Sequence, residues 1–145
     1  MKITIEDVKP GDEEEIIIRS NDLSATALKL ISELKMGDNK LTGMKDGNIT
    51  VLNPKNVYYF ESIDNKVFIY TKQDVYETKM KLYEIGEQYE NTDFFRASKS
   101  IILNITAIRC VRPAYSGRFE ALLFNDEKVI ISRQYVPDLK KKLGL

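Results

Sequence analysis

Two short stretches combine cationic and hydroxyl side chains with an adjoining apolar run. The first covers residues 94–104, where an aromatic pair and an apolar run flank four donor residues: Arg96, Ser98, Lys99 and Ser100. The second covers residues 130–135, where an apolar strand runs into Ser132 and Arg133. No acid lies inside residues 94–104. Binding residues are often carried by loops on a rigid scaffold. The two stretches therefore indicate cationic loops that bind a polyanion.

The absence of histidine narrows the chemistry that this chain can perform. Zinc sites built on Cys and His are excluded, and so are triads with an imidazole base. The single cysteine, Cys110, lies in a strand-like pattern, and no histidine is present to activate it. We expect Cys110 to be a buried small hydrophobe. No grouping of acid, base and nucleophile stands out, so we expect no enzymatic activity, no cofactor and no metal.

The net charge is zero, but the charges are unevenly distributed along the chain. Residues 96–145 carry ten Lys and Arg against four Asp and Glu, a balance of +6, whereas residues 1–50 and residues 51–95 are each at −3. A solvated tail is the plain reading of Lys140–Lys142. The other cations of the basic third are spread among predicted strands, which favours one anion-binding face.

Composition and the N-terminal residues predict a location in the cytoplasm. No apolar run approaches the roughly 18 residues of a membrane span. Residues 1–7 lack the apolar core of a signal peptide. A lone cysteine allows no intrachain disulfide, which is usual for proteins of a reducing compartment.

Residues 1–47 are predicted to form a strand–strand–helix extension. Residues 2–7 alternate between isoleucine and polar residues, and residues 13–20 contain three consecutive isoleucines. Apolar residues recur at helical spacing over residues 23–37, where Gly37 ends the pattern. A helix with a plain apolar face favours a structural or oligomer-contact role for this extension.

Residues 48–145 are predicted to be mostly β, with short helices. Asp46-Gly47 is a strong hairpin signal, and the strands that follow are rich in aromatic residues. Helical spacing returns at residues 79–90 and 134–143, and a single helical turn is expected at residues 104–107. Because the aromatic residues alternate along strands, we expect core or sheet-face packing for most of them; they include Tyr58, Phe60, Phe68, Tyr70, Tyr76 and Phe119.

From about residue 48 to its end, the chain resembles the LytTR (LytR/AlgR-type) DNA-binding domains of bacterial transcription regulators. The matching pieces agree in order and spacing: Tyr59-Phe60-Glu61-Ser62, the helix with Leu82 and Ile85, residues 94–104, Ile108, and Ile131-Ser132-Arg133-Gln134-Tyr135 with Leu139-Lys140 behind it. The resemblance implies a mostly antiparallel β-fold (α+β) whose loops enter successive major grooves of double-stranded DNA. Residues 1–47 are too short for a phosphoacceptor domain, so the chain resembles the stand-alone regulators of this type.

Carried over residue by residue, the resemblance places the DNA-reading positions at Lys66, Lys99 and Arg133. Lys66 lies in the turn at residues 64–66, Lys99 in the loop at residues 96–100, and Arg133 after the last strand. Arg133 can bond guanine O6 and N7 together, and either lysine can reach a guanine edge or a phosphate.

Other polar residues of the two stretches suit phosphates, which position a protein on DNA without specifying sequence. They are Arg96, Ser98 and Ser100. An alternative for Arg133 is an ion pair with Glu61 or Glu120. For Arg109 and Arg112 two roles are equally expected: contact with phosphate, or a solvated position at a strand edge.

These observations predict a sequence-specific, double-stranded DNA-binding transcriptional regulator, dimeric on the repeated half-sites of a promoter. We expect two parts in the chain. Residues 1–47 form an extension that helps dimerisation, and residues 48–145 form the DNA-binding domain. The resemblance also implies a membrane protein as a regulatory partner. The alternatives are a β-class protein-interaction module with an incidental basic face, and a binder of single strands or RNA that uses the tyrosines.

Overall fold

Two antiparallel sheets organise the computed structural model, which describes residues 2–19, 24–38 and 40–145. The larger sheet has the strand order β2-β1-β5-β4-β3-β7-β6, and the smaller has the order β10-β9-β8. The strands of the larger sheet are β1 (Leu41–Lys45), β2 (Asn48–Leu52), β3 (Val57–Ile63), β4 (Lys66–Thr71), β5 (Val75–Thr78), β6 (Phe94–Arg96) and β7 (Ile101–Asn104). The smaller sheet contains β8 (Ile108–Pro113), β9 (Phe119–Leu123) and β10 (Lys128–Ile131).

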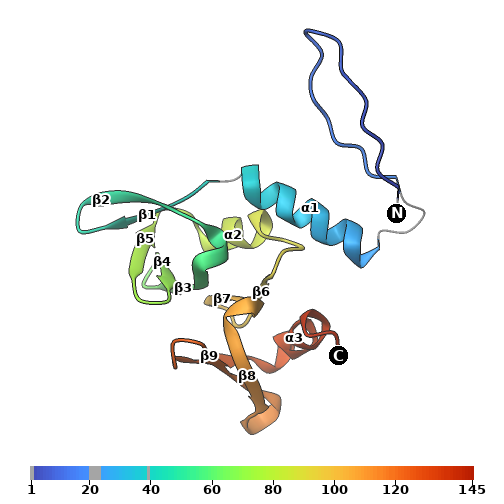
Figure 1. Ribbon diagram of the computed structural model, residues 1–145. Helices are drawn as coiled ribbons and strands as arrows, with labels where there is room; N and C mark the ends of the chain where they lie inside the picture. Colours follow the sequence, from blue (N-terminus) through green and yellow to red (C-terminus); the bar gives the residue numbers. More distant parts are fainter. Residues whose placement is uncertain (1, 20–23, 39) are drawn as a thin grey trace.

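In the described ranges, three α-helices and four 3-10 turns connect and cover these sheets (Figure 1). The α-helices are α1 (Ala25–Asp38), α2 (Leu82–Gln88) and α3 (Val136–Lys142). The 3-10 turns are η1 (Pro54–Asn56), η2 (Ile105–Ala107), η3 (Tyr115–Gly117) and η4 (Arg133–Tyr135). The predicted mostly antiparallel β-fold with short helices is confirmed.

The central strands of the larger sheet are buried on both faces, because successive side chains of a strand point to opposite sides. In β3, Phe60 packs with α2 in one core, whereas its neighbour Tyr59 packs in a second core with β9, β10 and α3. In β7, Ile102 and Leu103 divide between the two cores in the same way. The molecule is therefore layered, with α2 on one side of this sheet and the smaller sheet with α3 on the other.

Two tight hairpins fix the register of the larger sheet. Asp46 and Gly47 have φ values of 52° and 78°, and Asp64 and Asn65 have φ values of 50° and 64°. Such paired positive φ values match the right-handed twist of the flanking strands. The second turn pairs Ile63 with Lys66, so Lys66 directly follows the turn.

The predicted N-terminal strands are not present in the described chain. Residues 2–19 form an extended loop with a turn at residues 10–12, and this loop projects away from the sheets (Figure 1). Ile3 and Ile5 are 83% and 89% exposed. The two segments pair with no strand that the structure describes. An isolated two-stranded ribbon is marginal in water. Residues 20–23, where one predicted strand ends and the helix pattern begins, lie outside the described residues.

The helix expected over residues 23–37 is α1, and the strand after it belongs to the larger sheet. β1 pairs with both β2 and β5, and Leu41 is fully buried. The boundary predicted between residues 47 and 48 falls at the tip of the β1–β2 hairpin. No helix within the described ranges has the length and apolarity needed to cross a bilayer.

Cys110 is exposed, which corrects the expectation of a buried residue. A bulge between Ile108 and Cys110 interrupts the pairing of β8 with β9. Because the bulge adds one residue, the half-buried positions become Ile108 and Val111, and Cys110 turns outward.

Aromatic residues pack within the cores, as their alternation predicts. Phe60 is fully buried against Tyr89 and Phe94. Tyr59 stacks on Tyr70 with ring centroids 4.2 Å apart. These contacts hold the larger sheet rigid from both sides.

Candidate nucleic-acid interface

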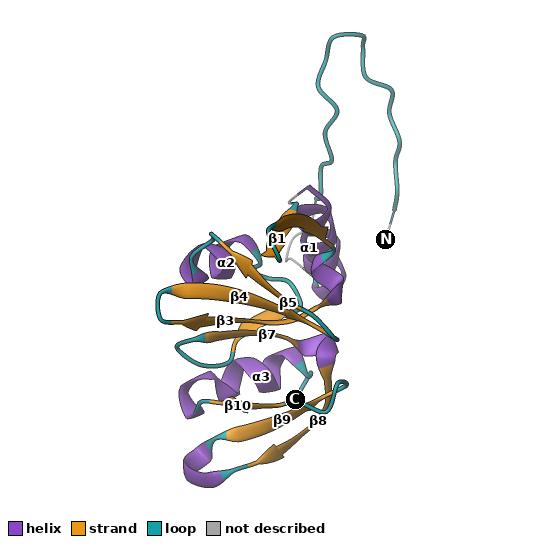
Figure 2. Cartoon of the chain, turned by 90° about the vertical axis from the view of Figure 1, so that its left-hand side faces the viewer, coloured by secondary structure: helices purple, strands orange, loops and turns teal. Residues whose placement is uncertain are grey.

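Three connections carrying predicted site residues emerge at one end of the two sheets. The backbone N–H of Ser62, at the end of β3, donates to the Ser100 carbonyl at 2.8 Å. The backbone N–H of Ser132, just after β10, donates to the Ala97 carbonyl at 2.8 Å. The loop at residues 97–100 therefore lies between the β3–β4 turn and η4. Figure 2 shows these connections on the left-hand side of the molecule. We call this end, with its three connections at residues 64–66, 97–100 and 132–134, the cationic rim.

The loop at residues 97–100 is held by hydrogen bonds of its own. The Ala97 N–H donates to the Ile101 carbonyl at 2.9 Å, and the Ala97 side chain is fully buried. The Arg96 guanidinium donates to the Lys99 carbonyl at 3.0 Å. The Ser100 N–H donates to Ser98 Oγ at 3.3 Å, and the two Oγ atoms lie 3.4 Å apart. The loop is thus preorganised, with the Lys99 side chain exposed at its tip.

Arg96 and the two serines have a structural role that the sequence does not reveal. All three are half-buried, and Arg96 braces the backbone that presents Lys99. One guanidinium nitrogen is engaged in this bond. The remaining N–H groups of Arg96 are available to a phosphate.

Lys66 and Arg133 are both exposed on the cationic rim. Lys66 is the first residue of β4, directly after the Asp64-Asn65 turn, and Arg133 is the first residue of η4. Among the described residues, neither they nor Lys99 takes part in an ion pair. Three cations without a carboxylate partner therefore lie at the same end of the molecule.

The ion pair considered for Arg133 is absent from the described part of the chain. Glu61 instead accepts a hydrogen bond from the Tyr70 hydroxyl at 3.1 Å. Glu120 bonds Arg112 at 2.9 Å and contacts Lys128 at 3.6 Å. The Arg112 hydrogen bond holds the pKa of the Glu120 carboxyl below its usual range.

Arg109 and Arg112 differ from the rim cations because both have acidic partners. Arg112 is engaged by Glu120, and Arg109 lies 3.3 Å from Asp126 in the turn between β9 and β10. That turn belongs to the other end of the sheets. Exposed ion pairs of this kind contribute little to stability, but they do reduce the charge available to a ligand.

The opposite end of the sheets carries carboxylates that are paired with cations. There the β4–β5 and β9–β10 turns lie together, since the Asn125 side-chain amide donates to the Lys72 carbonyl at 3.5 Å. Asp74, Asp126 and Glu127 lie in these turns. Lys45 pairs with Asp74, and Arg109 pairs with Asp126. The two ends of the sheets therefore differ: one has cations without an ion-pair partner among the described residues, and the other has ion-paired charges.

The turn between β8 and β9 also reaches the cationic rim. Gly117 in η3 has a φ of +75°, and a Cβ placed there would lie 2.8 Å from Arg133 Cδ. The sequence signals a turn at Ser116-Gly117, but no local pattern indicates that this turn touches Arg133.

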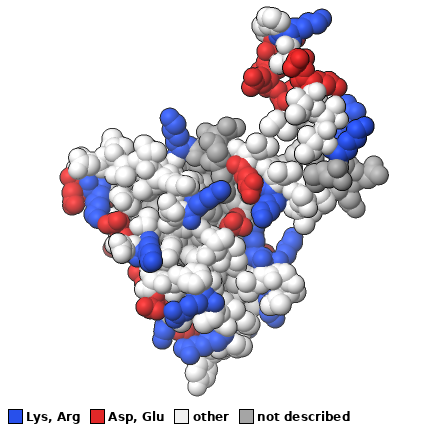
Figure 3. All heavy atoms as spheres, in the orientation of Figure 1, with Lys and Arg blue, Asp and Glu red and all other residues white. Residues whose placement is uncertain are grey.

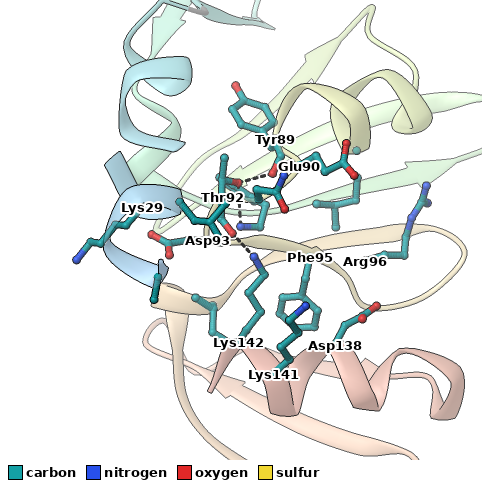
Figure 4. A pocket seen from close by; sticks show the side chains of 17 residues that line it. Lys29, Tyr89, Glu90, Thr92, Asp93, Phe95, Arg96, Asp138, Lys141 and Lys142 are labelled. Atoms are coloured by element: carbon teal, nitrogen blue, oxygen red, sulfur yellow. Dashed lines mark hydrogen bonds between the residues drawn. The ribbon is translucent and has the colours of Figure 1, made fainter. Parts of the chain in front are cut away.

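A groove of about 750 Å³ lies elsewhere, between α1, the connection from α2 to β6, and α3 (Figure 4). The Lys142 ammonium crosses it to donate a hydrogen bond to the Thr92 carbonyl. Burial lowers the pKa of Lys142. Glu90, Asp93 and Asp138 also line the groove, so its cations are offset by acids. We interpret these contacts as a tether between α3 and the α2–β6 connection.

Comparison with known proteins matches this chain to DNA-binding regulators. The model of the LytTr DNA-binding domain matches residues 47–144. Sensory transduction protein LytT of Enterococcus faecalis is 31% identical over 100 residues, which cover 69% of this chain and 41% of that protein. LytT of Bacillus anthracis is 26% identical over 146 residues, covering 95% of this chain and 59% of that protein.

Two further relatives agree with this match. Transcriptional regulatory protein YpdB of Escherichia coli K12 is 27% identical over 103 residues, which cover 70% of this chain and 42% of that protein. The solved LytTr DNA-binding domain of a response regulator from Bacillus cereus has the same fold, with a TM-score of 0.68 at 24% identity over 73% of this chain and 97% of that chain. The chain spans about half the length of the curated relatives it matches.

Proposed function

Because the chain belongs to the LytTR family of DNA-binding domains, we propose that it regulates transcription by binding double-stranded DNA through the cationic rim. The observation that carries this proposal is the pair of backbone hydrogen bonds, Ser62 to Ser100 and Ser132 to Ala97, that bring the three cation-bearing connections together. Unpaired cations gathered at one end of the sheets would orient the protein toward the polyanion. This activity requires no enzymatic step, and we assign it to the bacterial cytoplasm.

In this proposal the rim residues divide into base readers and phosphate binders. Arg133 reads a guanine edge through two parallel hydrogen bonds, which is the most common specific contact in the major groove. Lys99, whose loop lies between η4 and the β3–β4 turn, and Lys66, at that turn, each reach a base edge or a phosphate. Arg96, Ser98 and Ser100 contribute phosphate contacts, which set orientation rather than sequence.

A gel-shift titration on the DNA upstream of the chain's own gene tests the proposal. We expect retardation of this duplex, with binding that weakens steeply with salt. The plot of log K against log salt should have a slope of about −0.9 for every phosphate neutralised. The matched single strand, at the same salt, should compete poorly. If no duplex is retarded at low salt, the DNA-binding proposal fails and a protein-interaction module becomes the better reading.

We also propose that the protein binds repeated half-sites as a homodimer, with residues 1–47 contributing to the dimer contact. The loop at residues 2–19 exposes isoleucines that no described element of the chain covers: Ile3, Ile5, Ile16 and Ile17. Acidic residues accompany them, and Figure 3 shows these carboxylates gathered on the projecting segment. A second copy could cover the apolar side chains.

Sedimentation of the full chain tests the dimer contact. Replacing the four isoleucines by serine should leave folding unchanged, because their side chains are exposed, and should shift the protein toward monomer. A truncation should begin no later than residue 40, since β1 is part of the larger sheet. An unchanged oligomeric state in the serine variant would remove this segment from the dimer.

A further inference from the structure

The β8–β9 turn packs its backbone against the side chain of Arg133. A Cβ placed on Gly117 would lie 2.8 Å from Arg133 Cδ and 3.0 Å from Cγ. Contacts below 3.0 Å essentially do not occur for real Cβ atoms. The aliphatic stem of Arg133 therefore occupies the space that the missing side chain of Gly117 leaves open.

We propose that Gly117 is a positioning residue for Arg133, and that the β8–β9 turn orients the guanidinium that reads DNA on the cationic rim. The inference rests on the proposed function, because it concerns how Arg133 is presented to a base. It assigns to η3 a role in specificity although η3 itself need not touch the DNA.

The turn is stiff enough to act as such a support. Its ends are closed by two backbone hydrogen bonds, from the Ala114 N–H to the Arg118 carbonyl at 2.8 Å and from the Arg118 N–H to the Tyr115 carbonyl at 3.2 Å. Ser116 and Gly117 both have positive φ values, 59° and 75°, and these bring the backbone close to Arg133.

Arg133 needs a support of this kind because nothing else described fixes its guanidinium. An arginine side chain has many rotamers, and it loses this freedom when it binds. No ion pair within the described residues holds Arg133. A rigid backbone along its stem reduces the rotamers available before DNA arrives. This preorganisation lowers the entropic cost of binding.

The chain offers a control that separates backbone strain from the contact with Arg133. Gly47 has a φ of +78°, almost the value at Gly117, and a Cβ placed there meets nothing within 4 Å. Gly47→Ala and Gly117→Ala therefore introduce similar strain into exposed turns. Only Gly117→Ala displaces the Arg133 side chain.

The experiment is a double-mutant cycle on the full chain, using the duplex retarded in the gel shift. Gly117→Ala, Gly47→Ala, Arg133→Ala and the Gly117→Ala/Arg133→Ala double variant are titrated by fluorescence anisotropy. The titrations use the parent duplex and duplexes with single G·C replacements. Urea denaturation of each variant reports its stability. Gly117→Asn adds a Cβ in a residue that tolerates positive φ, and it serves if the alanine variant does not fold.

We expect Gly117→Ala to weaken binding roughly 2- to 12-fold, the range for losing the order of one flexible side chain. The loss should fall on the same G·C pair that Arg133→Ala ceases to recognise. In the Arg133→Ala background, Gly117→Ala should cause no further loss. Gly47→Ala should lose similar stability but keep its affinity and its base preference.

Two results would overturn the inference, and they can be told apart from failure of the proposed function. If Arg133→Ala weakens binding but Gly117→Ala behaves like Gly47→Ala, or if the two losses simply add, Gly117 does not position Arg133. If Arg133→Ala binds like the parent chain, the assignment of Arg133 as a reader falls, and the positioning role falls with it.

Discussion

Replacing Arg133 by alanine should separate DNA recognition from folding. Arg133 is exposed and forms no ion pair with any described residue. Its loss should therefore change the free energy of unfolding by no more than about 0.5 kcal/mol. If its guanidinium bonds a guanine edge, binding should weaken by about 1–3 kcal/mol, which is roughly a 5- to 150-fold rise in Kd.

Fluorescence anisotropy at constant salt measures this loss, and base substitution locates it. The Arg133→Ala variant should bind the parent duplex more weakly than the parent chain does. The difference should disappear on a duplex in which the recognised G·C pair is replaced. Urea denaturation should give the same midpoint for both proteins.

Arg109→Ala is the matched control, because it removes the same charge at the opposite end of the sheets. Arg109 lies 3.3 Å from Asp126, and such an exposed pair contributes about 1 kcal/mol or less to stability. We expect its affinity for DNA to stay within about twofold of the parent. Equal losses of affinity in both variants would show that net charge, rather than a positioned base-reading residue, determines binding. An Arg133→Ala variant with the affinity of the parent chain would refute the assignment of Arg133 as a base reader.

Three further substitutions test the loop, the core and the link between the sheets. Lys99→Ala should leave folding intact but weaken DNA binding. If Lys99 contacts a phosphate, the slope of log K against log salt should become shallower by about 0.9. An unchanged slope with unchanged affinity would exclude Lys99 from the interface. Asn104→Ala removes a buried amide that donates to the Val57 carbonyl at 2.9 Å. The free energy of unfolding should fall by about 1–3 kcal/mol, which lowers the urea midpoint. A midpoint equal to that of the parent chain would contradict this. Burial and the hydrogen bond to Glu127 raise the pKa of Tyr59 above its usual 10.0, so the stability that its protonated hydroxyl provides should be lost as pH rises above about 10. Urea titrations should find a smaller alkaline loss in Tyr59→Phe than in the parent, and equal losses would rule out this contribution.

Local physics predicts much of the sheet architecture. Asp46-Gly47 marks a hairpin because both residues tolerate positive φ, and both have it in the structure. The aromatic strand at residues 57–63 and the helix at residues 82–88 follow from their periodicity. The helical turn expected after Asn104 is η2, where the Asn104 side chain accepts a hydrogen bond from the Thr106 N–H.

Other features depend on long-range pairing and escape such reasoning. The isoleucines near residues 3 and 16 have strand periodicity, but no edge of the described chain pairs with them, so they remain exposed. The bulge in β8 turns Cys110 outward because it adds one residue opposite β9. Alternation read from the sequence assumes regular pairing and cannot anticipate such a bulge.

The candidate site could be predicted only in part. Lys66, Lys99 and Arg133 follow from the resemblance to LytTR domains, and their roles on DNA remain predictions. Their proximity depends on hydrogen bonds between segments far apart in the chain, such as Ser132 to Ala97. The contact between Gly117 and Arg133 has no local signal, because it joins two loops from different parts of the smaller sheet.

The central claim is that the cationic rim binds DNA. Hydrogen exchange of the full chain, with and without the duplex identified by gel shift, tests this claim most directly. DNA binding through the cationic rim should slow exchange at residues 64–66, 97–100 and 132–134. The turns at residues 72–74 and 125–127, at the opposite end of the sheets, should exchange at the same rate in both samples. Protection of those two turns, with the rim unchanged, would contradict the proposed mode of DNA binding.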